Sequence, residues 1–193
     1  MPRDGRCRVT SPRPRGPTRV LVIGYGNALR TDDGVGWHAA RLLAGDPRLV
    51  DVVVVAEHQL APELAFDLSL ASLGVLLDAS TETPAGAVTV RRLAAAGGGS
   101  AGGGRGGTGP GGTRPSPGAS SHHVGPELLL ALALELYGSA PEAVVVSVGV
   151  AEMGPGEALT PRVAAALPAV ADVVARLVAE HEERAAGEER EPA

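Results

Sequence analysis

The stretch RVLVIGYGNALRTDDGVG, residues 19–36, decides the fold of this chain. Residues 19–24 form an almost continuous aliphatic run that ends in glycine, which is typical of a strand buried on both faces of a parallel sheet. Four apolar residues then recur at the spacing of one helix face: Val35, Ala39, Leu42 and Leu43. A strand, a glycine-rich loop and a helix in this order predict an α/β fold.

The rest of the chain repeats this alternation of strand and helix patterns. We predict further strands at residues 50–56, 74–78, 87–92 and 143–149, and further helices at residues 62–70, at residues 126–137 and from Thr160 onward. The run at 87–92 alternates apolar and polar side chains, as an edge strand does. The sequence therefore predicts a three-layer α/β/α sandwich with a central twisted, mostly parallel sheet of about five strands.

Two of the predicted helices carry signals for their ends. The helix at 126–137 is almost entirely apolar, so we expect it to be a core element, and Gly138 should end it. Thr160 and Pro161 form an N-cap and first-turn pair for the last helix. Pro168 should kink that helix, because proline removes a backbone donor from the helical ladder.

Three stretches are predicted to lack regular structure: residues 1–17, the Gly/Ser/Pro-rich run 97–120 and the charged tail 181–193. The middle run has the composition of a flexible linker. Too few residues follow it to form a second domain. We therefore predict a single domain over residues 18–180, interrupted by an insertion at 97–120.

Composition and charge narrow the class of protein. Hydrophobic residues make up 44% of the 193 and aromatic residues only 2%, so the core must be built from Ala, Val and Leu. A formal net charge of −5 disfavours nucleic acid as a partner. The single Cys7 cannot form an internal disulfide, and neither a signal peptide nor a membrane-spanning run stands out. We expect a cytoplasmic monomer that binds no membrane.

The loop after the first strand resembles a nucleotide-binding turn at first sight. Its glycines Gly24 and Gly26 would begin a G-x-G-x-x-G motif, but Leu29 stands where the third glycine belongs. Asp32 and Asp33 lie where the following helix begins and would repel a pyrophosphate. The loop therefore predicts no nucleotide cofactor.

Several side chains that can bind a metal or transfer a proton follow predicted strands. In open α/β sheets, sites form beyond the carboxyl ends of the strands. The candidates there are Asp32, Asp33, His58, Asp78, His122 and His123. Either of the first two could instead only complement the helix dipole, and the histidines could lie on the surface. Asp33, Asp78 and His122 could converge as a metal site, but their spacing leaves this open.

The segment GYGNALRTDDGVG resembles the signature of hydrogenase maturation endopeptidases, G-x-G-N-x-L-x-x-D-[DE]-G-x-G, at every defined position. Four further pieces agree in order: HQLAPEL at 58–64, LLDA at 76–79, SHHV at 121–124 and LTP at 159–161. The resemblance covers about residues 18 to 180, apart from the glycine-rich insertion. It implies a peptidase with a central twisted sheet between helices.

This resemblance also implies a function and a set of site residues. Members of the family remove a C-terminal extension from the large-subunit precursor of a nickel–iron hydrogenase after nickel has been inserted. Carried over by position, the residues that contact nickel are Asp33, Asp78 and His122, and the His122-His123 doublet leaves either histidine as the ligand. The nickel would be supplied by the precursor. Asp32 is a further candidate, as the carboxylate that takes a proton.

Three features depart from the family pattern. Asp33 replaces the glutamate of some members, and Glu57-His58-Gln59 replaces the Gly-Gly pair that many members have. The insertion at 97–120 lies immediately before the histidine doublet. Two alternatives therefore stay open beside an active protease: an accessory protein that checks the nickel site without cutting, and an inactive member of the family.

Overall fold

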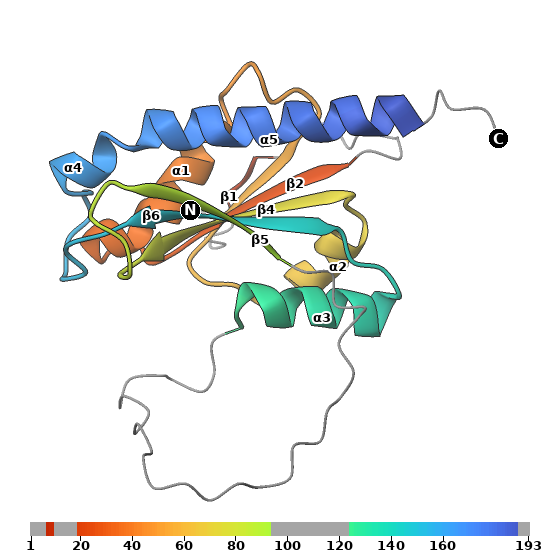
Figure 1. Cartoon of the computed structure of the whole chain (residues 1–193). Coiled ribbons are helices and arrows are strands. Elements are labelled where there is room, and N and C mark those ends of the chain that lie inside the picture. Colours follow the sequence, from red (N-terminus) through yellow and green to blue (C-terminus); the bar gives the residue numbers. More distant parts are fainter. Residues whose placement is uncertain (1–6, 10–18, 94–123, 189–193) are drawn as a thin grey trace, which may run out of the picture.

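The computed structural model describes residues 7–9, 19–93 and 124–188, and in it a single sheet lies between two layers of helices (Figure 1). The six strands are β1 (Cys7–Val9), β2 (Val20–Tyr25), β3 (Val53–Glu57), β4 (Leu73–Ser80), β5 (Val88–Leu93) and β6 (Glu142–Gly149). Their order across the sheet is β1-β3-β2-β4-β6-β5. The four central strands are parallel, and the edge strands β1 and β5 are antiparallel to their neighbours. The predicted fold class is confirmed, with β1 as an additional strand.

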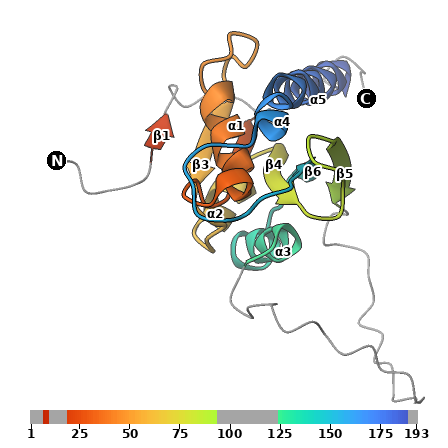
Figure 2. The ribbon, with the colours of Figure 1, turned by 90° about the vertical axis from the view of Figure 1, so that its left-hand side faces the viewer.

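The helices divide between the two faces of the sheet. They are the short 3-10 helix η1 (Thr31–Gly34), then α1 (Val35–Leu43), α2 (Leu64–Ser69), α3 (Pro126–Tyr137), α4 (Pro161–Ala164) and α5 (Leu167–Glu188). Helices α1 and α5 cover one face, and α2 and α3 cover the other (Figures 1 and 2). Among the described helices, none is both long and apolar enough to cross a membrane.

Side chains of the central strands alternate between two aliphatic cores. Val22 and Val75 point toward α1 and α5, whereas Leu21 and Leu76 point toward α2 and α3, and all four are fully buried. This alternation follows from the two-residue period of a strand, and burial on both faces explains the unbroken apolar runs. The large buried side chains are almost all Val, Leu or Ile, as the composition predicts.

Helix α3 is only partly the core element that its apolar sequence indicates. It buries Leu129, Leu130 and Ala133, but Leu136 is 61% exposed. With a sheet on one side only, a helix can bury a single stripe, so Leu128, Leu134 and Leu136 face outward. Gly138 ends the helix in the left-handed conformation, with φ of 74°, as predicted.

The final helical segment differs from the single kinked helix that the sequence predicts. It divides into α4 and α5, and Pro168 lies in the first turn of α5. A proline costs little in a first turn, because the N–H that it lacks would have no helical partner there. Pro161 occupies the first position of α4, directly after Thr160 as predicted.

Two segments that were expected to lack regular structure, residues 1–17 and 181–193, contain a strand and part of a helix. Cys7–Val9 pairs antiparallel with β3, and the charged tail continues α5 as far as Glu188. The tail is rich in Ala, Glu and Arg, which are strong helix formers. Contacts with the sheet layer also support it, since Arg184 pairs with Glu142. The predicted insertion at 97–120 lies outside the described residues.

Candidate active site

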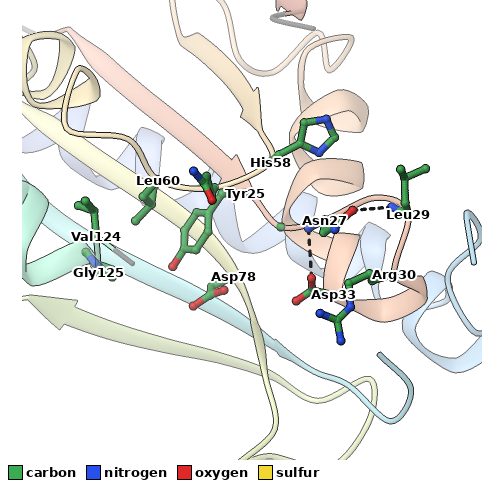
Figure 3. A pocket seen from close by; sticks show the side chains of 13 residues that line it. Tyr25, Asn27, Leu29, Arg30, Asp33, His58, Leu60, Asp78, Val124 and Gly125 are labelled. Atoms are coloured by element: carbon green, nitrogen blue, oxygen red, sulfur yellow. Dashed lines mark hydrogen bonds between the residues drawn. The ribbon is translucent and has the colours of Figure 1, made fainter. Parts of the chain in front are cut away.

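A cavity of about 650 Å³ opens beyond the carboxyl ends of β2, β3 and β4. Its lining residues are Tyr25, Gly26, Asn27, Leu29, Arg30, Asp33, His58, Gln59, Leu60, Asp78, Val124, Gly125 and Pro126. Figure 3 shows that the Asp33 and Asp78 carboxylates face this space from different elements. The cavity therefore occupies the sheet edge at which the sequence predicts a site.

Strand register places Asp78 beside the end of β2. Ile23 pairs with Leu76 and Gly24 pairs with Leu77, so the next residues, Tyr25 and Asp78, are neighbours across the two strands. Because successive side chains alternate between faces, Tyr25 and Asp78 share the face covered by α2 and α3. The register thus fixes this tyrosine and this carboxylate on one wall of the cavity.

Two glycines of the signature allow the loop to fold back onto the strand ends. Gly26 has φ of 137°, and a Cβ there would lie 2.0 Å from the Asp33 carbonyl oxygen. At Gly36, a Cβ would lie 2.2 Å from the carbonyl oxygen of Leu77 and 2.4 Å from that of Tyr25. Only glycine permits such close approach of two backbones. The start of α1 therefore rests directly on β2 and β4, which brings Asp33 to the cavity that Asp78 faces.

Asn27 holds the loop that carries Asp33. Its backbone N–H donates to Asp33 Oδ2 at 3.3 Å, and its side-chain Oδ1 accepts from the N–H of Leu29 at 2.9 Å (Figure 3). An asparagine that accepts from the backbone two residues later stabilises a tight turn. Asn27 thus shapes the turn with its side chain and orients the Asp33 carboxylate with its backbone.

Asp78 carries its carboxylate in a half-buried position. Its Oδ1 accepts a hydrogen bond from the N–H of Ala79 at 2.8 Å. Burial raises the pKa of Asp78 above the ordinary value, and the nearby charge of Asp33 raises it further. Two carboxylates that repel each other across one cavity make a place where a cation, a proton or a positively charged ligand group is favoured.

Asp32, the neighbour of Asp33, does not line the cavity. Its carboxylate is fully buried and accepts four hydrogen bonds: from the N–H of Ala151 at 3.2 Å, from that of Glu152 at 3.2 Å, and from the N–H and Oγ1 of Thr160 at 2.7 and 3.0 Å. Burial alone would raise the pKa of Asp32, but these hydrogen bonds outweigh it and hold the pKa below the ordinary value. The structure therefore places Asp32 as a tie between two loops, away from the position that a proton-accepting catalytic group would need.

The predicted histidines differ in what the structure shows of them. His122 and His123 lie outside the described residues, although Val124, which follows them directly, lines the cavity. His58 lies at the cavity rim, but it is exposed and its ring turns away from the two carboxylates (Figure 3). Within residues 7–9, 19–93 and 124–188, no three His, Cys, Asp or Glu side chains gather closely enough to hold a metal ion. Of the predicted ligands, the described residues therefore bring only Asp33 and Asp78 to the cavity.

Tyr25 lines the cavity and is not among the site residues predicted from the sequence. Its hydroxyl is buried, points toward the Asp78 carboxylate (Figure 3) and, among the described residues, makes no hydrogen bond of regular geometry. A hydroxyl buried without any partner costs about 1–3 kcal/mol, so the nearby Asp78 carboxylate is its natural acceptor. Burial, followed by the charge of Asp78, raises the pKa of the phenol. The alternation of the strand could have revealed it, because Tyr25 follows Ile23 on the same face.

Several solved structures share the fold of this chain. A hydrogenase 2 maturation peptidase from a Thaumarchaeota archaeon is 25% identical, with 84% of this chain and 99% of that one covered and a TM-score of 0.57. The chain has the fold of the hydrogenase maturation endopeptidases. The endopeptidase HybD from E. coli (22% identity, 84% and 93% covered, TM-score 0.59) and the protease HycI from Thermococcus kodakarensis (17%, 83% and 92%, 0.58) share that fold.

The likeness to hydrogenase maturation endopeptidases is a likeness of fold over most of the chain. No protein-family model matches the chain, and no curated protein matches it in sequence. The resemblance first indicated by the segment at 24–36 therefore extends in three dimensions over 84% of the chain. The cavity with Asp33 and Asp78 lies within this shared fold.

Proposed function

We propose that the chain is an endopeptidase that removes the C-terminal extension of a nickel–iron hydrogenase large-subunit precursor after nickel insertion. The observation that carries the proposal is the pair of carboxylates, Asp33 and Asp78, facing one cavity in the fold of hydrogenase maturation endopeptidases. The fold supports assignment to the hydrogenase maturation endopeptidases, and the cavity supplies two carboxylates that suit peptide hydrolysis.

Recognition of a loaded precursor would rest on Asp33, Asp78 and one histidine of the His122-His123 doublet. Carboxylate and imidazole ligands suit a borderline divalent cation such as nickel. Three protein ligands leave coordination positions open, which suits a metal ion that the precursor already holds. Nickel is thus part of the substrate.

Peptide hydrolysis at this cavity requires a proton acceptor. Nickel in the precursor would supply a Lewis acid beside the scissile carbonyl. A carboxylate oxygen of Asp33 or Asp78 that does not bind nickel would accept the proton of the attacking water and return that proton to the leaving amine. Asp32 is not suited to this step, because its oxygens already accept four hydrogen bonds.

The test is processing of a nickel-loaded precursor by Asp78→Ala and Asp33→Asn variants. Loss of a ligand or of a positioned proton acceptor should lower the rate by about 100-fold or more. Asp172→Ala provides the matched control, since Asp172 is an exposed acid outside the cavity and its loss should leave processing unchanged. Full activity of Asp78→Ala, with the fold intact by circular dichroism, would overturn the assignment.

A further inference from the structure

Tyr25 occupies a position that its packing alone does not explain. The residue ends β2, and its ring packs against the core on the α2 and α3 side. A phenylalanine would make the same apolar contacts without burying a hydroxyl. The hydroxyl nevertheless lies in the cavity wall, points toward Asp78 and lacks another described partner (Figure 3). Its position against a carboxylate of the candidate site indicates a role in that site.

The Asp78 carboxylate is held at one oxygen. Oδ1 accepts from the N–H of Ala79, which leaves Oδ2 without a fixed donor among the described residues. A carboxylate held at one oxygen can still turn about its terminal bond, because that rotation is soft. A donor on the second oxygen would fix the plane of the group. Tyr25 is the cavity residue whose hydroxyl faces it (Figure 3).

We propose that Tyr25 is a positioning residue, whose O–H donates to Asp78 and, together with the N–H of Ala79, fixes the carboxylate in the orientation that the cavity requires. This inference rests on the proposed function, because it assigns Tyr25 to the same site. Groups that orient a ligand or base in this way are a recurring feature of metal and hydrolytic sites. The hydroxyl makes no bond to the substrate and takes no part in proton transfer.

The hydroxyl of Tyr25 is a donor at neutral pH. A tyrosine phenol has an ordinary pKa of about 10. The group therefore stays protonated throughout the range in which the protein would act. A protonated phenol beside a carboxylate has one favourable arrangement, in which the phenol donates and the carboxylate accepts.

The test compares Tyr25→Phe with Tyr137→Phe, the same change at the other tyrosine of the chain. Tyr137 lies on α3, is 47% exposed and does not line the cavity. With a nickel-loaded precursor, Tyr25→Phe should lower kcat by about 10-fold or more, while KM changes by less than about twofold. Tyr137→Phe should leave both unchanged. An unchanged kcat for Tyr25→Phe, or an equal fall in both variants, would overturn the inference.

A second measurement needs no cleavage and separates this inference from the proposed function. Thermal unfolding is followed for Tyr25→Phe, for Asp78→Asn and for the double variant. If the hydroxyl donates to Asp78, the shifts in Tm of the two single variants do not add in the double variant. Additive shifts would contradict the pairing even if the wild type processes the precursor. A wild type that does not cleave would overturn the proposed function, while non-additive shifts would still support the pairing.

Discussion

Asp32 and Asp33 are adjacent in sequence and lie in opposite kinds of surroundings. Asp32 is enclosed by protein donors, with four hydrogen bonds and no exposed surface. Asp33 accepts one bond from Asn27 at 3.3 Å and faces the cavity opposite Asp78. A carboxylate whose lone pairs are all used holds structure together, whereas one with free lone pairs beside a second acid is available for a ligand.

The comparison extends to the segments that each carboxylate joins. Asp32 ties the start of α1 to the loop between β6 and α4, since its partners are Ala151, Glu152 and Thr160. Asp33 and Asp78 instead face each other across an opening. The signature therefore combines a structural anchor with a site residue, and the anchor keeps the site residue in place.

The largest expected effect on stability comes from removing the anchor. Asp32→Ala leaves several buried donors unpaired, and each such donor costs about 1–3 kcal/mol, so we expect a total loss of about 3–5 kcal/mol. For a chain of this size, that loss lowers Tm by about 10 °C. Asp33→Ala is the matched control and should cost about 1 kcal/mol, because it removes one long hydrogen bond. Denaturant unfolding measures both variants. Equal losses of unfolding free energy would contradict the assignment of Asp32 as a structural anchor and of Asp33 as a site residue.

The second prediction concerns Gly36, where the start of α1 packs against the ends of β2 and β4. Gly36→Ala places a Cβ against the carbonyl oxygens of Leu77 and Tyr25, so α1 must move away from the strand ends. We expect a loss of about 2–3 kcal/mol, as for other overpacked positions. Gly187→Ala in α5 meets nothing within 4 Å and should instead stabilise by about 0.5–1 kcal/mol. Calorimetry of both variants measures these changes in stability. An unchanged stability of Gly36→Ala would contradict the prediction.

The pH dependence of stability should separate Asp32 from the other acids. Because hydrogen bonds depress the pKa of Asp32 in the fold, its contribution is fully present above the unfolded pKa of about 3.9 and is lost as pH falls through the folded pKa. Asp32→Asn cannot titrate. The difference in unfolding free energy between wild type and Asp32→Asn should therefore shrink below about pH 4. Urea titrations at several pH values test this, and a constant difference would contradict it.

The smallest expected effect is a gain in stability, from a substitution of Asp78. Burial raises the folded pKa of Asp78, so the ionised form destabilises the fold at neutral pH. Asp78→Asn, which is uncharged, should raise the free energy of unfolding slightly at pH 7 when no divalent metal is present. That gain should disappear as pH falls through the folded pKa toward the unfolded value of about 3.9. A destabilised Asp78→Asn would indicate that Asp78, like Asp32, is a structural anchor.

Sequence alone was sufficient for most of the fold. The aliphatic runs predict the central parallel strands, because burial on both faces demands continuous apolar residues. Asp33 and Asp78 are also expected at one edge of the sheet, because each follows the carboxyl end of a predicted strand, but their spacing leaves open whether they converge. Strand β1 and the end of α5 were missed, since three polar-flanked residues give no strand period and a charged tail has no apolar stripe.

The roles of individual side chains were harder to predict than their positions. Nothing in the sequence between 24 and 36 distinguishes Asp32 from Asp33. The distinction depends on Thr160 and the loop before it, which donate hydrogen bonds to Asp32 although they lie more than a hundred residues later in the sequence. Tyr25 was missed for a related reason, because alternation along β2 gives only its face, and the register between β2 and β4 is needed to place it beside Asp78.

Intact mass of the large-subunit precursor after incubation with this protein, with and without nickel loaded, tests the central claim most directly. We expect loss of a C-terminal peptide from the nickel-loaded form only. No mass change in either form, for a precursor that another hydrogenase maturation protease can cut, would contradict it and favour an accessory or inactive member of the family.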